Sequence, residues 1–503
     1  MNEDTRQNVL APELRATLEP HTPVYNERGV IAEHYRDLQG LPVLEAARQA
    51  YLLPSASTES TIRAVFQAVE IAILNLADLI GRAATDVAQG RTGRAMVKMS
   101  WARGFHRVLV RLSTMPQQLG LVPADVASCG LLRIGDSPAF VEYLHALERF
   151  DRATLAQIDA GALALETAVA EESLDSPFFA LIHAARVSNH ESTIWEENLA
   201  TIAVGVPVPS YEQFVVAAGI RSAVYDRVLR GDTYFTQFRG LHQIPETLGE
   251  ETNDRTEQAI REIRAGNLRT AVDHLRVVNV LADGMLATLP PMADNLATSD
   301  YHEIRENLGL TSGSHSVCLR FQMFTDLYHQ LAEALEGALN GSESRSRDDA
   351  SLVNTVRRID ETSGVDSGAW LRHLLLSECL TFRSFIFQWR DQHLHMPRNN
   401  LGGGSTKSLT GSPDAVTAVR KMRRSSRLSD PMIPLARGRG LSAPTGDDTD
   451  SPLRSYLDSE ASLDTRTLLA TGQVTQGRFV AVQERLGFFA NRCPFTPPRP
   501  RRA

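Results

Sequence analysis

Apolar residues recur at intervals of three and four positions through most of this chain. Positions three and four apart lie on the same face of an α-helix, so this spacing is typical of helices that bury one side. Alternating apolar and polar runs, which are typical of half-buried strands, are scarce. The pattern predicts an all-α fold. Its clearest run consists of Ile62, Val65, Phe66, Val69, Ile73, Leu76 and Leu79.

The same periodicity predicts further helices along the chain. Two of them have recognisable starts, at Asp175-Ser176, which precedes Pro177, and at Asp366-Ser367. An Asp or Ser side chain at such a start accepts the free amide hydrogens of the first helical turn. The expected ranges are about 93–113, 137–150, 176–199, 252–265, 267–289, 314–338, 367–396 and 465–487.

The chain is long enough for two domains. It has 503 residues, of which 43% are hydrophobic, and can bury a core of that size. Pro207 and Pro209 cannot continue a helix, which makes the segment 205–210 the predicted junction. We therefore expect a helical domain at 1–204, a second helical domain at 205–425, and a polar segment with a last helix at 426–503.

Charge and cysteine content exclude several classes of function. The net charge is −8 and both signs mix along the chain, so nucleic acid is not an expected partner. The four cysteines form no close pair of the kind that holds zinc or exchanges disulfides, which fits a reducing compartment. The amino terminus lacks the pattern of a secretory signal, and no run reaches the ~20 apolar residues that span a bilayer. A cytoplasmic protein without a membrane partner is expected.

The two halves of the chain share a weak internal repeat. Matching residues stand 176 positions apart, and they are Gln67 and Gln243, Glu70 and Glu246, Gly90 and Gly266, and Ala95 and Ala271. With a larger offset, Trp195 corresponds to Trp389. Phe66 then takes the place of His242, and Leu199 takes the place of His393. Tandem duplication with a degenerate first half is one explanation, and chance similarity between amphipathic helices is the other.

Three histidine-containing or hydroxyl-rich segments are candidates for chemistry. His393 follows the aromatic residues Phe382, Phe385, Phe387 and Trp389, which could wall a flat macrocycle while the imidazole binds its iron. His395 lies about 200° around the same helix, so both histidines cannot face one iron. An ordinary core or surface histidine is the alternative for His393.

The remaining candidates would contact a substrate. Phe238 and His242 are four residues apart and share a helix face, where a ring and an imidazole could hold a flat molecule. Tyr301 and Arg305 have the same spacing, so a phenol and a guanidinium could reach one ligand. Ser312-Gly313-Ser314-His315-Ser316 begins a helix, and amides and hydroxyls there can bind ligand oxygens. Ordinary packing, a solvated face and a helix cap are the respective alternatives.

Residues 230–425 resemble the tryptophan 2,3-dioxygenase superfamily of haem-dependent aromatic oxygenases, to which the indoleamine dioxygenases are related. Phe238 to Glu246 is similar to that family's Phe-x-x-x-His-Gln-x-x-Glu segment, and the segment from Ser312 to Arg320 is similar to its Ser-Gly-Phe-Gln-Ser-x-x-Phe-Arg segment. Trp389-Arg390-x-x-His393 resembles its Trp-Arg-x-x-His segment. Arg305 stands seven residues before Ser312, as the family's substrate-clamping arginine does.

The resemblance implies a helical bundle of the tryptophan dioxygenase type that binds haem b through the iron ligand His393, with Trp389 beside it. It places His242 and Ser312 in the catalytic distal pocket, with Phe238, Tyr301, Arg305 and Gly313 around an aromatic, amino-acid-derived substrate. Dioxygen or peroxide would be the co-substrate. Monooxygenation or rearrangement in place of ring dioxygenation stays open, as does a homo-oligomer.

The chain departs from the family pattern in its glycine-rich loop. Leu401-Gly402-Gly403-Gly404-Ser405 stands where the family has Gly-Thr-Gly-Gly-Ser, so glycine replaces the threonine at position 402. Thr406 and Thr410 are the candidate replacements for its hydroxyl. The segment 399–412 is expected to be a loop that closes on substrate. A non-enzymatic helical protein that binds haem or another ligand is the competing hypothesis.

Overall fold

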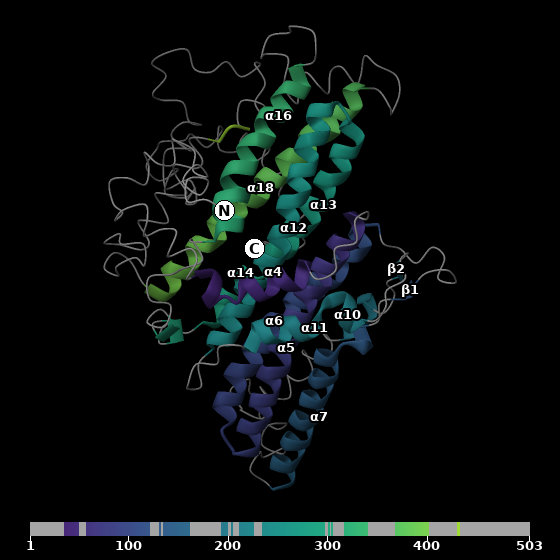
Figure 1. Cartoon of the computed structure of the whole chain (residues 1–503). Coiled ribbons are helices and arrows are strands. Elements are labelled where there is room, and N and C mark those ends of the chain that lie inside the picture. The colour runs from purple at the N-terminus through teal and green to yellow at the C-terminus, as the bar shows by residue number, and fades with distance from the viewer. Residues whose placement is uncertain are drawn as a thin grey trace, which may run out of the picture. The chain divides into compact units, whose positions relative to one another are not determined.

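The computed structural model confirms the all-α prediction (Figure 1). Among the residues it describes, strand structure is limited to β1 (Gly130–Leu131) and β2 (Ala203–Val204), which pair antiparallel with Gly130 opposite Val204. The described residues are 35–49, 57–120, 130–131, 134–160, 193–199, 203–204, 211–225, 234–296, 300–301, 303–304, 316–340, 368–401 and 430–432.

The chain divides into two compact units. The first contains residues 1–420 and 431–438, and the second contains residues 421–430 and 439–503. All helices described below belong to the first unit. The junction predicted at 205–210 lies outside the described residues, as do the helix predicted for about 465–487 and the two predicted helix starts at 175–176 and 366–367.

In the first half, the helices predicted from the apolar run at 62–79, for about 93–113 and for about 137–150 are present and longer than their sequence patterns indicated. Of the helix predicted for about 176–199, the structure describes residues 193–199, which are helical. Ser137 caps α7, because its hydroxyl accepts a hydrogen bond of 3.1 Å from the amide of Phe140. The elements are α4 (Leu41–Gln49), α5 (Ser57–Ala88), α6 (Thr92–Gln118), the short 3-10 helix η2 (Ile134–Asp136) and α7 (Pro138–Asp159).

In the second half, two helices differ from expectation. The helix predicted to start at about 252 begins at Phe235, and the helix predicted for about 314–338 opens as a π-helix, η4. Helix α18 also continues to Leu401, three residues into the predicted loop. The elements are α10 (Tyr211–Val215), α11 (Ala217–Tyr225), α12 (Phe235–Ala265), α13 (Leu268–Leu286), α14 (Leu289–Asn295), η4 (Val317–Leu327), α16 (Tyr328–Asn340) and α18 (Gly368–Leu401).

Helix α5 is the centre of the core. Its stretch Glu59–Ala88 is long and apolar enough to cross a membrane, but 89% of its most apolar window is buried inside the protein. The helix contacts α6, α7 and α12, so its apolar residues pack against other helices. Figure 1 shows α5, α6 and α7 together in one bundle and α12, α13, α16 and α18 together in another.

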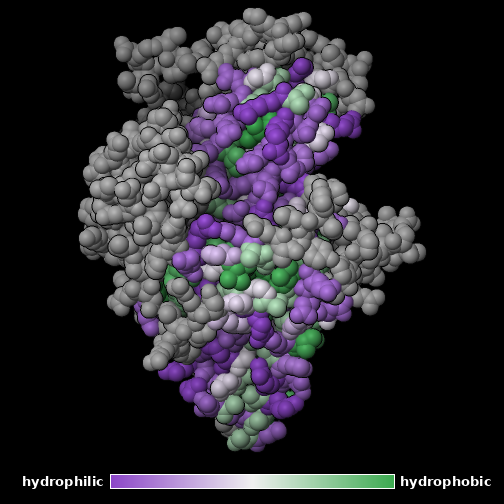
Figure 2. Space-filling view, viewed as in Figure 1, coloured by the Kyte–Doolittle hydropathy of each residue, from purple (hydrophilic) through white to green (hydrophobic). Residues whose placement is uncertain are grey.

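The two bundles meet where α5 packs against α12. Gly240 of α12 allows this close approach, because a side chain at that position would overlap the amide group of Asn75 on α5. Helices α4 and α11 also contact each other. On the face shown in Figure 2, hydrophilic residues cover most of the described surface, and hydrophobic residues gather across the middle, near α4, α6 and α11.

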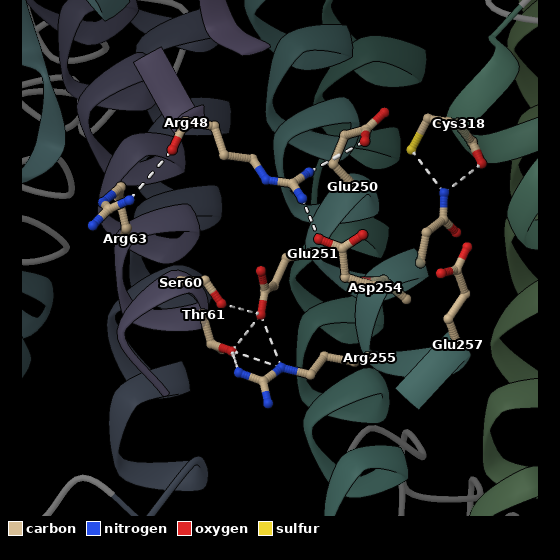
Figure 3. A network of polar contacts seen from close by, with 12 residues as sticks. Arg48, Ser60, Thr61, Arg63, Glu250, Glu251, Asp254, Arg255, Glu257 and Cys318 are labelled. Carbon is tan, nitrogen blue, oxygen red and sulfur yellow. Dashed lines mark hydrogen bonds and ion pairs between the residues drawn. The ribbon is translucent and has the colours of Figure 1, made fainter. Parts of the chain in front are cut away.

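A buried polar network joins the same two helices (Figure 3). The carboxylate of Glu251 on α12 accepts hydrogen bonds from the hydroxyls of Ser60 (2.9 Å) and Thr61 (2.6 Å) on α5. It also accepts one of 2.9 Å from Nε of Arg255, which in turn donates to Thr61. Nearby, Arg48 pairs with Glu250 at 3.2 Å. Charge-assisted hydrogen bonds, as well as apolar packing, therefore join α5 of the first half to α12 of the second half.

Candidate functional site

Phe238 and His242 form a contacting pair on α12. Their ring centroids are 4.4 Å apart with an interplanar angle of 45°, as the four-residue spacing predicts. Nδ1 of His242 lies 2.8 Å from the carbonyl oxygen of Phe238. A carbonyl can only accept, so Nδ1 carries the proton and Nε2 of the neutral ring has the lone pair. The helix thus presents a hydrogen-bond acceptor beside an aromatic ring.

The protonation state of His242 is set by burial and by His393. The pKa of His242 is lowered to about 4, chiefly by burial and to a smaller extent by the charge of a protonated His393, whereas the hydrogen bond to Phe238 raises it. At neutral pH the ring is therefore uncharged. The electrostatic effect of His393 also means that the two imidazoles lie within interaction range, although they are 151 positions apart in the sequence.

His393 lies on α18, one turn after Trp389. Trp389 packs against Phe324 of η4 and against Phe385, each with a centroid distance of 6.1 Å. Arg390 donates a hydrogen bond of 3.2 Å to the carbonyl of Phe324 and stacks over its ring at 5.7 Å. These contacts fix this turn of α18 against the π-helix. His393 is partly exposed, whereas His395 is exposed.

The structure describes only some of the predicted site residues. Tyr301 is buried. Arg305, the pocket residues Ser312 and Gly313, and the loop residues Thr406 and Thr410 lie outside the described residues. The described part of the hydroxyl-rich segment is Ser316, and its hydroxyl accepts a hydrogen bond of 2.9 Å from the amide of Leu319. Ser316 therefore caps η4, in agreement with a helix start at this segment.

Glu246, one turn after His242, is the centre of a buried polar triad. Its carboxyl group accepts a hydrogen bond of 2.9 Å from the hydroxyl of Tyr35 and another from the hydroxyl of Ser316. Burial raises the pKa of Glu246 to about 7, against the lowering effect of these two hydrogen bonds. The triad connects α12 to the start of η4 and to a residue far away in the sequence.

The first half contains a matching triad around Glu70. Its carboxyl group accepts hydrogen bonds from Ser137 (2.6 Å) and from Tyr211 (2.8 Å). Ser137 caps α7 as Ser316 caps η4, and Tyr211 stands 176 positions after Tyr35, as Glu246 does after Glu70. The same three residue types thus make the same contacts twice.

The helix hairpins repeat as well. Gly90 and Gly266, 176 positions apart, both have positive φ, of 72° and 82°, at the turn that ends α5 and α12. The following helices begin 176 positions apart, at Thr92 and at Leu268. A left-handed turn residue at this place favours glycine. The repeated offset therefore corresponds to repeated local structure.

The two halves differ at the positions of His242 and His393, which correspond to Phe66 and Leu199 in the first half. Phe66, Trp195 and Leu199 of the first half are each 0% exposed, whereas Trp389 and His242 keep 9% exposure and His393 is partly exposed. The second half also has the π-helix η4 in the place of the regular helix α7. Irregular helices of this kind occur frequently at functional sites. Of the two matching sites, the second therefore holds both imidazoles, that of His242 buried and that of His393 partly exposed.

Around Trp195, the first half is filled by a closed aromatic cluster. Trp195 packs against Phe140 and Tyr143 with centroid distances of 5.7 and 5.8 Å. The hydroxyl of Tyr143 lies 3.2 Å from Nε2 of His106, which is fully buried. Burial lowers the pKa of His106 to about 3. This histidine is packed in the core and has no access to a ligand.

The low pKa of His106 predicts a loss of stability in acid. The pKa in the unfolded chain is near 6.5, so the unfolded state binds more protons below that pH. The stabilising contribution of neutral His106 is present above pH 6.5 and is lost as the pH falls, by at most about 1.4 kcal/mol per pH unit. In His106→Gln, we expect a flatter dependence of the unfolding free energy on pH between 6 and 4, measured by urea titration. An unchanged slope would contradict this assignment. His242, whose pKa is lowered in the same direction, contributes to the slope that remains.

Sequence reasoning missed the supporting residues of the site. The sequence patterns did not single out Tyr35, and they included Ser316 and Glu246 only as members of motif segments or of the internal repeat. One usable pattern existed, because the 176-position offset also relates Tyr35 to Tyr211. The contact between Tyr35 and Glu246 joins residues 211 positions apart, which no local pattern reveals.

Comparison with known proteins leaves the resemblance untested. A scan against protein-family models finds no match to this sequence, and a search of curated proteins finds no significantly similar one.

Proposed function

We propose that the second half of this protein is a haem-dependent oxygenase that acts on an aromatic, amino-acid-derived substrate. One observation carries the proposal. A protonated His393, which is partly exposed, lowers the pKa of the buried His242, whereas their first-half counterparts, Phe66 and Leu199, are completely buried apolar residues. Two imidazoles of this kind suit the two faces of an iron porphyrin.

We infer further that the chain is a tandem duplication within a tryptophan dioxygenase-type bundle. The paired triads and the paired hairpins support it, because chance similarity between amphipathic helices would not reproduce buried polar contacts. On this proposal the first half, with its closed aromatic cluster, is a structural copy that packs against the oxygenase half as an internal partner.

The described residues fit a haem group. His393 offers an imidazole at the end of α18, and Trp389 with Phe324 and Phe385 offers aromatic rings next to it. Among the described residues, no group of three or more His, Cys, Asp or Glu could hold a metal ion, and a porphyrin iron needs only one protein ligand. When bound, haem would supply the activation of dioxygen or peroxide.

The protein residues would position the substrate and handle its proton. His242 would accept a hydrogen bond from a substrate N–H or O–H group through Nε2, since Nδ1 is engaged by Phe238. The ring of Phe238 would pack on the aromatic part of the substrate. By resemblance, Arg305 and Tyr301 would bind its carboxylate end and Ser312 would lie near the iron, with Gly313 beside it and Thr406 or Thr410 in place of the lost loop threonine.

An absorption spectrum tests the proposal directly. The purified full chain, reconstituted with haem b, should show a Soret band that shifts when tryptophan, tyrosine or indole is added. Substrate-dependent consumption of oxygen or peroxide separates an oxygenase from a non-enzymatic haem-binding protein. Product mass then distinguishes dioxygenation from monooxygenation or rearrangement. A protein that takes up no haem would overturn the proposal.

We expect His242→Phe to remove turnover and to keep the cofactor. Phenylalanine is the residue at the matching position 66, so the scaffold accommodates it. Loss of a positioned proton acceptor lowers rates by about 10²–10⁴-fold. Single-turnover measurement against the wild type checks this, with the Soret band and helical circular dichroism as controls. Turnover within a few-fold of wild type would exclude the role of His242.

A further inference from the structure

The two polar triads are crossed between the halves. Tyr35 lies before α5 in the first half, but it donates to Glu246 of the second half. Tyr211 lies before α12 in the second half, but it donates to Glu70 of the first half. Each glutamate therefore receives one hydrogen bond from the serine of its own half and one from the tyrosine of the other half.

Two glutamines show the same exchange. Nε2 of Gln67 in the first half donates to the carbonyl of Val215 (3.1 Å), and Nε2 of Gln243 in the second half donates to the carbonyl of Gln39 (2.8 Å). Positions 39 and 215 are again 176 apart. The segments around Tyr35 and Tyr211 are thus reciprocally exchanged, as in a domain-swapped pair of identical chains.

The Tyr35 triad is adjacent to the proposed haem site. Glu246 is one turn after His242 on α12, and Ser316 ends the segment 312–316 whose serine and glycine are candidates for the distal pocket. All three side chains are buried, so their hydrogen bonds are shielded from water. Tyr35 and Ser316 donate to the same carboxyl group, so the hydrogen bond from Tyr35 to Glu246 also affects the position of Ser316.

We propose that Tyr35 is a positioning residue of the second-half site, acting through Glu246 and Ser316 on the start of η4. It is supplied by the segment that precedes the first-half helices, so the oxygenase half is incomplete without the first half. The role of Tyr35 in the site depends on the proposed haem function. The crossed support, which means that Tyr35 stabilises the start of η4 through Glu246 and Tyr211 stabilises the start of α7 through Glu70, does not depend on it.

A matched pair of variants tests the proposal. Tyr35→Phe and Tyr211→Phe each remove one buried hydroxyl from an equivalent triad. Hydrogen exchange of the full chain, read by mass spectrometry, should become about tenfold faster at 316–327 in Tyr35→Phe and at 137–147 in Tyr211→Phe, as expected for one lost hydrogen bond. Faster exchange at the opposite helix, or no change in either, would overturn the crossed arrangement.

The cofactor supplies the second measurement. Cyanide, titrated into the ferric haem-reconstituted protein and followed at the Soret band, would report on the pocket that His242 and Ser312 are proposed to line. Its Kd should change by about tenfold in Tyr35→Phe and by less than about twofold in Tyr211→Phe. Equal changes of the cyanide Kd in the two variants would mean that Tyr35 has a purely structural role. Absence of a Soret band in the wild type would instead refute the proposed function, while the exchange data would still decide the crossed support.

Discussion

Replacing His393 with alanine should abolish the Soret band of the haem-reconstituted protein and leave its helical circular dichroism near that of the wild type. The imidazole is the proposed iron ligand, so its removal would take away the bond that holds the haem to the protein. The fold should survive because His393 is partly exposed and lies near the end of α18. Trp389 and Arg390 would still pack that helix against Phe324.

His395→Ala is the matched control. It removes a histidine from the same helix, two residues later, and its side chain is exposed. It should bind haem as the wild type does. In His393→Gly, added imidazole should restore a Soret band, because a free ligand can enter the space that the side chain leaves. A full Soret band in His393→Ala would remove His393 from the site.

The same substitution has an effect that needs no haem. His393 lowers the pKa of His242 through its positive charge. In His393→Ala, the pKa of His242 should therefore rise, while burial, the larger cause, still holds it below its ordinary value. Proton NMR of the haem-free protein can follow this change. An unchanged pKa would mean that the two imidazoles do not share one site.

The helical class could be predicted because apolar periodicity is a local property. Helix α5 is the clearest case, since nearly every residue of its apolar run is buried. The start of α12 could not be predicted in the same way. Its first turns contain Arg239, Gln243 and Glu246, and these buried polar residues interrupt the apolar pattern. Their partners include the carbonyl of Gln39 and the hydroxyl of Tyr35, about 200 positions earlier.

The candidate site was predictable only where its residues share one helix. The spacing of Phe238 and His242 predicts their contact, and that of Trp389 and His393 places both on one face. The interaction of His242 with His393 depends on how α12, η4 and α18 pack, which local spacing does not encode. The π-helical form of η4 was likewise not predictable, because its sequence has the same apolar spacing as an α-helix.

Glu251→Ala should lower the free energy of unfolding by about 3–5 kcal/mol, the typical effect of breaking a buried ion pair. Glu251 and Arg255 have side-chain exposures of only 2% and 4%. Without the carboxylate, the Arg255 guanidinium would stay buried with the Thr61 hydroxyl as a neutral partner. Urea unfolding, followed by circular dichroism, measures the change.

Two comparisons separate this effect from a general cost of losing a charge. Glu148→Ala breaks the Arg152 pair, whose side chains are 75% and 63% exposed, and should change stability by less than about 1 kcal/mol. The double variant Glu251→Leu with Arg255→Met removes both charges and should recover much of the stability, because the penalty arises from the unpaired guanidinium. If the double variant is as unstable as Glu251→Ala, the hydrogen bonds to Ser60 and Thr61 are what stabilises the contact between α5 and α12.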